Sequence, residues 1–203
     1  MKTTHDQTGG DDDTMARLHE RLVREARRDE LLDIAYRTVD SPVGALLLAA
    51  TPAGLVRVAF ASEGHPDVLE RLAASISPRI LEAPGRLELD VAASQLDEYF
   101  AGRRRDFDLT IDLQLLSGFR RNVVEHLREI AYGTTASYAA LAATAGSPKA
   151  VRAVGTAIAN NPIPVVMACH RVIRSDGTIG QYLGGPEVKR ALLDLESTAH
   201  PRK

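Results

Sequence analysis

The sequence predicts an α/β N-terminal domain, a small sheet with helices, followed by a mostly α-helical C-terminal domain that contains a helix-turn-helix. The first half holds short, β-branched apolar runs between amphipathic stretches, whereas helical periodicity dominates the second half. The charge also changes sign: residues 1–116 carry 14 Lys and Arg against 21 Asp and Glu, and residues 117–203 carry 11 against 6. A length of 203 residues fits one to two domains.

Residues 1–33 are interpreted as a charged leader, disordered at first and then helical. Met1–Asp13 is polar and acidic, so we expect disorder there and no secretory signal. Thr14 is a candidate N-cap for a surface helix that runs to about Ile34. The narrow apolar stripe of this helix consists of Leu18, Leu22 and Val23.

Residues 34–116 are predicted to form the α/β domain. The expected strands are Ala35–Val39, Ala45–Ala50, Leu55–Phe60 and Phe107–Leu113. A Thr-Pro-Ala-Gly turn between the second and third strands indicates a hairpin. Helices are expected near Pro66–Ile76 and over Leu87–Phe100. In the latter we expect inward-facing Val91, Leu96 and Tyr99. The run Arg103–Arg105 could contact phosphate, but such a run is more often a solvated surface.

The composition excludes several classes of protein. Apolar residues make up 44% and charged residues 26%, which is ordinary for globular proteins, and no apolar run approaches the roughly 18 residues that span a bilayer. A single cysteine excludes an internal disulfide and a multi-cysteine zinc site, and with no export signal it indicates a reduced cytosolic thiol. Aromatic residues at 4% do not favour a base-stacking platform. The basic second half is where a polyanion would bind.

Residues 117–203 are predicted to form the C-terminal domain. Its first helix is amphipathic and ends at Tyr132-Gly133, with apolar positions Phe119, Val123, Leu127 and Ile130. Ser137 is expected to cap a helix over Tyr138–Ala145, and Ser147 to cap another over Pro148–Asn160. Helix, glycine turn and helix are typical of a helix-turn-helix, and two packed helices without DNA contact are the alternative.

The second of these helices combines small residues with one protruding cation. The residues expected on its buried face are Val151, Val154 and Ile158. The small residues are Ala150, Ala153, Gly155 and Ala157, which would let the backbone approach another surface closely. Arg152 is the only cation in the helix interior, so it would extend as a single long side chain.

A candidate nucleophile follows these helices. Ile163–Ala168 is too short and too rich in proline for a helix, so we expect a buried extended segment that ends at Cys169. A free cysteine has a pKa of about 8.5, and a neighbouring base such as His170 would help to form the thiolate. Extended neighbours point to opposite faces, so His170 would reach the sulfur through a bend or a water. The alternative is a buried structural cysteine beside an exposed histidine.

Taken together, the motifs of this chain resemble the O6-alkylguanine-DNA alkyltransferases, or methylated-DNA–protein-cysteine methyltransferases. In the second half, the similar segments are Tyr132–Tyr138, Ser147–Gly155, Asn160–Ile173, Gly180–Gly185 and Lys189–Glu196. In the first half, they are Ser41–Gly44 and Gln95–Gly102. The Cys-His-Arg-Val block behind a helix-turn-helix is the most specific part of a resemblance that covers about Ile34 to Glu196.

The resemblance implies a repair protein that flips a damaged base out of duplex DNA and transfers its alkyl group, once and irreversibly, to its own cysteine. The substrate would be O6-alkylguanine, with O4-alkylthymine as a second candidate. No cofactor or metal is needed, because the protein itself is the acceptor. A relay of cysteine, water, histidine and glutamate would fall on Cys169, His170 and Glu196, with Asn161 bracing the site. We expect a monomer that acts on double-stranded DNA in the cytoplasm, at the nucleoid, and not at a membrane.

The resemblance also assigns roles in binding DNA and the base. The side chain that fills the gap left by the flipped base falls on Arg152, and the tyrosine that turns the phosphate falls on Tyr138. Ser147 and Ala153 complete the residues expected at the DNA, where the family's helix-turn-helix lies in the minor groove. The base pocket would be formed by Val172, Tyr182 and Leu183. In this pocket the backbone carbonyls of Cys169 and Val172 would bind the exocyclic amine, and Tyr182 would help to neutralise the leaving guanine.

Four positions depart from the pattern of the family. Ala168 and Ala131 each stand where the family usually has proline, Val124 where it has tryptophan, and Leu183 where a serine is frequent. These departures bear on efficiency and substrate range more than on the type of reaction. Two other functions remain open: a non-catalytic protein that binds alkylated DNA, and a Cys-His hydrolase, for which the sequence specifies no oxyanion hole.

Overall fold

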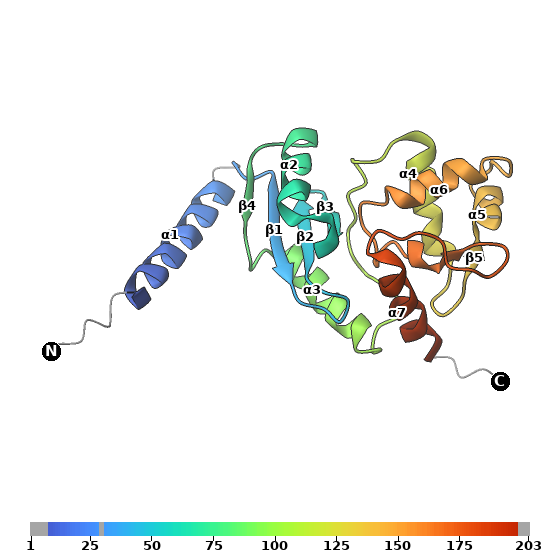
Figure 1. The fold of residues 1–203 in the computed structure, drawn as a ribbon. Coiled ribbons are helices and arrows are strands. Elements are labelled where there is room, and N and C mark those ends of the chain that lie inside the picture. Colours follow the sequence, from blue (N-terminus) through green and yellow to red (C-terminus); the bar gives the residue numbers. More distant parts are fainter. Residues whose placement is uncertain (1–7, 29–30, 199–203) are drawn as a thin grey trace.

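The computed structural model describes residues 8–28 and 31–198, which form two parts side by side with a helix, α1, projecting from the first (Figure 1). Helix α1 spans Thr8–Arg28, so it begins earlier and ends earlier than predicted, and the expected disorder is wrong from Thr8 onward. Residues 1–7 lie outside the described residues. Ion pairs four residues apart, such as Arg21 with Glu25, support this charged helix.

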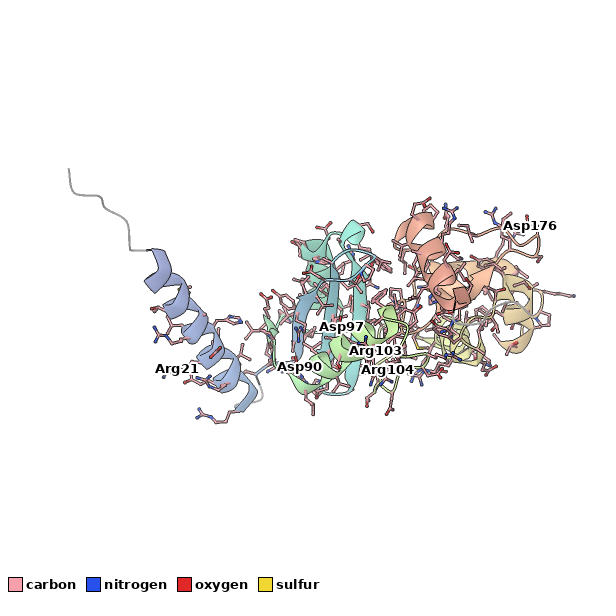
Figure 2. All side chains as sticks on the ribbon, turned by 90° about the horizontal axis from the view of Figure 1, so that it is seen from below. Arg21, Asp90, Asp97, Arg103, Arg104 and Asp176 are labelled. Carbon is pink, nitrogen blue, oxygen red and sulfur yellow. The ribbon has the colours of Figure 1, made fainter. Side chains whose placement is uncertain are left out.

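The predicted apolar stripe of α1 is only partly covered. Val23 is buried, whereas Leu18 and Leu22 are 55% and 51% exposed. Contact with the first part includes His19, whose Nε2 lies 2.6 Å from the carbonyl oxygen of Glu82. In Figure 2 the labelled Arg21 lies on α1, away from both folded parts. None of the helices within residues 8–28 and 31–198 is long and apolar enough to cross a membrane.

A four-stranded mixed sheet forms the centre of the first part. Its strands are β1 (Ile34–Val39), β2 (Leu46–Thr51), β3 (Gly54–Phe60) and β4 (Ile80–Glu82), in the order β3-β2-β1-β4. The pairs β1–β2 and β2–β3 are antiparallel, which confirms the predicted hairpin, and β4 lies parallel to β1. The three-residue β4 was not predicted, because it is too short to show a period. The small sheet with helices is confirmed, and so is the mostly helical second part.

The predicted strand Phe107–Leu113 is wrong. Within it, only Ile111 forms a β-bridge, an isolated one to Leu55. The carbonyl of Thr110 and the amide of Asp112 pair with Leu55, at 2.9 Å each. At Asp108 the side chain of Gln95 takes both backbone groups, because its amide donates to the Asp108 carbonyl at 2.9 Å and accepts from the Asp108 amide at 2.8 Å. A side chain therefore satisfies backbone groups that a strand would pair with a neighbour.

Two helices pack on the sheet. Helix α2 (His65–Ser75) lies close to the predicted Pro66–Ile76, and the predicted bounds of α3 (Leu87–Phe100) are confirmed. Leu96 and Tyr99 are buried as expected, but Val91 is 36% exposed. The buried positions of α3 recur every three or four residues, and Val91 falls between them. Figure 2 shows Arg103 and Arg104 just beyond the end of α3. Arg104 is ion-paired with Glu98 at 2.7 Å.

Up to residue 198, where the described residues end, the second part contains four α-helices: α4 (Gly118–His126), α5 (Tyr138–Thr144), α6 (Val151–Ala159) and α7 (Gly185–Thr198). A 3₁₀ turn, Leu127–Glu129, continues α4, so this helix ends earlier than predicted. Two short parallel strands, β5 (Ala136–Ser137) and β6 (Val172–Ile173), bring the segment after Cys169 next to the start of α5.

Helices α5 and α6 are joined by a turn, as predicted, but the second cap is wrong. The Ser137 hydroxyl accepts from the amide of Ala140 at 3.0 Å, which confirms the first cap. Ser147 instead accepts with its backbone carbonyl from Ala150 in a turn, and α6 begins only at Val151. Because the helix starts late, Val151 is 37% exposed, while Val154, Ala157 and Ile158 form the buried face.

Candidate active site

Cys169 begins a 3₁₀ helix, Cys169–Arg171, and the predicted extended segment before it is wrong. Ile163–Ala168 is buried as expected, apart from half-buried Val166, but it folds into turns, in which the amide of Met167 donates to the carbonyl of Ile163 at 2.8 Å. Asn161 holds these turns with both ends of its side-chain amide. Its Oδ1 accepts from the amide of Ile163 at 3.1 Å, and its Nδ2 donates to the carbonyl of Met167 at 2.8 Å.

The sulfur of Cys169 is fully buried and contacts the same asparagine. Asn161 Nδ2 lies 3.1 Å from Cys169 Sγ. Burial raises the pKa of the Cys169 thiol to about 11, although the Asn161 hydrogen bond and the charge of Lys189 offset part of the rise. The thiol is therefore neutral at rest, and a base must remove its proton before it can act as a nucleophile.

His170 is buried, contrary to the alternative of an exposed histidine. Its Nε2 lies 2.9 Å from Glu196 Oε1, while its Nδ1 is buried and has no hydrogen-bond partner among the described residues. Burial lowers the pKa of His170, and the bond to Glu196 offsets part of this shift. A 3₁₀ helix has three residues per turn, so consecutive side chains diverge by about 120° rather than pointing to opposite faces.

Glu196, on α7, is buried and accepts hydrogen bonds from four residues. The donors are His170 Nε2 at 2.9 Å, Arg171 Nε at 2.9 Å, the Tyr99 hydroxyl at 2.8 Å and the Gly133 amide at 3.0 Å. Burial alone would raise the pKa of this carboxyl, but the hydrogen bonds from His170 and Arg171 outweigh it and lower the pKa to about 2. The carboxylate is therefore ionised, and its lone pairs are satisfied.

Three residues around this site, Arg171, Tyr99 and Lys189, had no predicted role in its chemistry. Arg171 also donates to the carbonyl of Ile130 at 2.6 Å, and its guanidinium lies 5.6 Å from the centre of the Tyr132 ring. Tyr99 reaches the site from α3, in the first part of the chain. Lys189 is buried and donates to the carbonyl of Val172 at 2.6 Å. All three lie inside the similar motifs, but a motif does not specify contacts between distant segments.

The residues expected at the base pocket are not all together. Tyr182 and Leu183 line a cavity of about 110 Å³ with Ile158, Ala159 and Gln181. Val172 does not line this cavity. The Tyr182 ring packs edge-on against Phe60 of β3 at 5.6 Å. Burial raises the pKa of Tyr182 well above its usual value, so its hydroxyl keeps its proton.

A larger groove of about 540 Å³ adjoins this cavity, and two of the expected DNA-contacting residues line it. Tyr138 and Arg152 lie there together with Arg174. The side chain of Arg152 is exposed and forms no ion pair or hydrogen bond with any residue that the structure describes. Ser147 and Ala153 do not line the groove, because the turn before α6 and the outer face of α6 carry them elsewhere.

Two family models match the chain. Residues 34–113 match the ribonuclease-like domain, and residues 118–198 the DNA binding domain, of 6-O-methylguanine DNA methyltransferase. Together the two matches span most of the 203 residues. The chain belongs to the 6-O-methylguanine DNA methyltransferase family.

Relatives in this family are similar in sequence to most of the chain. The methylated-DNA–protein-cysteine methyltransferase of Mycobacterium tuberculosis is 39% identical over 178 residues, 83% of this chain and 95% of the relative. The constitutive enzyme of Bacillus subtilis is 37% identical over 169 residues, 83% of this chain and 98% of the relative.

Solved structures agree as well. The crystal structure of the Mycobacterium tuberculosis O6-methylguanine methyltransferase has a TM-score of 0.72 at 37% identity, covering 84% of this chain and 96% of that one. A crystal structure of Mycobacterium tuberculosis OGT in complex with DNA has a TM-score of 0.70 at 38% identity, covering 82% of this chain and 95% of that one.

Proposed function

We propose that this methyltransferase-family protein repairs double-stranded DNA by moving an alkyl group from the O6 of guanine to Cys169 Sγ, with O4-alkylthymine as a second candidate substrate. One observation carries the proposal. The single cysteine of the chain is buried against Asn161 and directly followed by a buried histidine whose Nε2 is held by Glu196. The relatives are methylated-DNA–protein-cysteine methyltransferases by name, which accords with this chemistry.

The first step forms the thiolate. The thiol proton of Cys169 passes through a water to His170 Nδ1, the ring nitrogen that has no partner among the described residues. His170 Nε2 keeps its proton and its bond to the ionised Glu196, which stabilises the imidazolium. Because burial lowers the pKa of His170, the ring is neutral at pH 7 and can accept the proton.

The second step is a displacement at carbon. The new bond forms between Cys169 Sγ and the alkyl carbon, while the bond from that carbon to O6 breaks and its electrons stay with the guanine. The Tyr182 hydroxyl, which keeps its proton, supplies a hydrogen bond to the leaving base. The product is a thioether, which has no acidic proton left, so each molecule reacts once and needs no cofactor.

Access to the alkyl group requires base flipping, because a side chain cannot reach that group inside the stack. Arg152 is exposed on α6 and free to enter the gap in the duplex, with Tyr138 and Arg174 beside it at the flanking phosphates. We assign residues 117–203 to DNA binding and alkyl transfer, residues 34–116 to support of that site, and residues 1–33 to a leader. A monomer at the nucleoid in the cytoplasm suffices for this function.

Intact-protein mass spectrometry tests the proposal. The protein is incubated with a duplex containing one O6-methylguanine, and we expect a mass gain of one methyl in place of one hydrogen. Cys169→Ser should bind the same duplex but gain no mass, since the hydroxyl is a weak nucleophile of nearly the same volume. Binding of the wild-type protein without a mass gain would instead favour a non-catalytic lesion-binding protein.

A further inference from the structure

We propose that the cleft between the two parts of the chain binds phosphates of the DNA strand on one side of the flipped base. This inference rests on the proposed function. The cleft has a volume of about 430 Å³ and lies between β3 and α2 on one side and the end of α6 on the other. Three arginines line it: Arg57 from β3, Arg71 from α2 and Arg120 from α4.

The charge of this cleft is unbalanced. Arg57 is ion-paired with Glu63, the only carboxylate in the lining, and also donates to the carbonyl of Pro162 at 3.2 Å. Burial lowers the pKa of Arg57, and the like charge of Arg71 lowers it further, while Glu63 offsets part of this shift. The side chains of Arg71 and Arg120 form no hydrogen bond or ion pair with any described residue, so two positive charges have no partner among those residues.

Three arginines outside the cleft, Arg121, Arg104 and Arg105, do have partners. Arg121 is ion-paired with Glu125 at 2.9 Å, and Arg104 with Glu98. The guanidinium of Arg105 lies 5.8 Å from the centre of the Tyr132 ring. Guanidinium groups that have no carboxylate partner, such as those of Arg71 and Arg120, match the oxygens of a phosphodiester, which they can bind with paired N–H donors.

The cleft lies next to the site where the base would enter. It shares Leu183 and Ala159 with the small cavity beside Tyr182. That small cavity shares Ala159 and Gln181 with the groove that Arg152 lines. Ala159 lines all three. A strand whose base occupies the middle hollow has phosphates on both sides of that base. One flank would lie at the groove of Arg152, and the other at Arg71 and Arg120.

The salt dependence of binding measures these contacts. We compare the wild-type protein, the double variant Arg71→Gln/Arg120→Gln, and the control Arg121→Gln, whose arginine adjoins Arg120 but is already paired. Binding of a fluorescent duplex with one O6-methylguanine is followed by anisotropy over a range of salt. Each lost phosphate contact lowers the slope of log K against log salt by about one, so we expect a slope smaller by about two in the double variant. The control should keep the wild-type slope.

Shortened duplexes show on which side of the lesion the contacts lie. Duplexes shortened on one side or the other of the lesion are bound by each protein. We expect the difference between the wild-type protein and the double variant to vanish for one shortened duplex and to persist for the other. An unchanged slope, or a difference that both truncations reduce equally, would overturn the proposal.

Two further readouts separate the causes of failure. The extent of methyl transfer at saturating DNA reports the proposed function on its own, and we expect it to be equal in all three proteins. If the wild-type protein gains no methyl, the proposed function fails while the salt slopes still test the cleft. If inorganic phosphate raises the melting temperature of the wild-type protein only, and the slopes agree, the cleft is a site for free phosphate and the proposal is wrong.

Discussion

Cys169 and Glu196 are both buried in the same site, yet burial has opposite outcomes for their charges. The sulfur accepts one side-chain hydrogen bond, from Asn161, and the pKa of the thiol rises to about 11. The carboxylate accepts bonds from His170, Arg171 and other donors, which overcome the cost of burial and lower its pKa to about 2. The number and charge of the donors, and not depth alone, therefore decide which group is ionised at rest.

The two ends of the site also draw their support from different parts of the chain. Asn161 and Lys189, beside the sulfur, both belong to the second part. The carboxylate receives the Tyr99 hydroxyl from α3. Phe60 and Arg57 of β3 also support the second part, at the Tyr182 ring and the Pro162 carbonyl. The first part of the chain thus holds the second in the geometry that the chemistry needs.

Removing the charge at the carboxylate end should have the largest effect. Glu196→Gln leaves the guanidinium of Arg171 buried without its counter-ion, which typically costs about 3–5 kcal/mol of unfolding free energy. The rate of methyl transfer should fall on the order of a hundredfold or more, since His170 loses the group that stabilises its protonated form. Urea unfolding and single-turnover kinetics measure the two effects. Glu187→Gln, in an exposed ion pair on the same helix, should change stability by less than about 0.5 kcal/mol.

The same comparison predicts how stability depends on pH. The Glu196 carboxyl has a lowered pKa, so its contribution is complete above its usual pKa of 4.5 and is lost as the pH falls towards about 2. The Cys169 thiol has a raised pKa, so its contribution is complete below the usual pKa of a free cysteine, about 8.5, and is lost as the pH rises towards about 11. Each loss amounts to about 3 kcal/mol at most, from about 1.4 kcal/mol for each unit of pKa. Melting temperatures across pH should show Cys169→Ala removing only the alkaline loss, and a variant that removes neither would contradict this assignment.

Tyr99→Phe tests the support that crosses between the two parts. The ring keeps its packing, but Glu196 loses one donor, and a hydrogen bond to a charged group contributes roughly 1.5–3 kcal/mol. We expect lower stability and a methyl-transfer rate that falls several-fold, with the acid loss of stability beginning at a higher pH. Tyr36→Phe is the control, because Tyr36 lies on β1 and its side chain forms no hydrogen bond with a described residue. Equal effects of both substitutions would show that the Tyr99 hydroxyl does not hold the carboxylate.

The sequence predicted the hairpin, α3 and the place of Asn161 at the site, because periodicity and motif spacing are local properties. It failed where a side-chain amide replaces backbone pairing. Gln95 satisfies both backbone groups of Asp108, so an alternating segment forms no strand. Asn161 does the same for the segment before Cys169, so a buried apolar run folds into turns. Apolar alternation reports which side chains are buried, and it does not report where the backbone hydrogen bonds go.

The smallest expected effect concerns Ala168, where the family usually has proline. Its φ of −69° lies within the range of proline, and its amide donates no backbone hydrogen bond within the described residues. Ala168 also lines a cavity of about 150 Å³, which offers room for the ring. Ala168→Pro should therefore raise stability by about 0.4–1 kcal/mol, through a less flexible unfolded chain, and raise the transfer rate if it fixes Cys169 more firmly.

The opposing effect is that proline disfavours helical angles in the residue before it, here Met167, whose amide closes a turn onto Ile163. Thermal melts and single-turnover rates, with Ala168→Gly as the opposite change in flexibility, decide between the two. A proline variant that is slower and less stable would show that the turn at Met167, and not the freedom of Ala168, sets the geometry of the nucleophile.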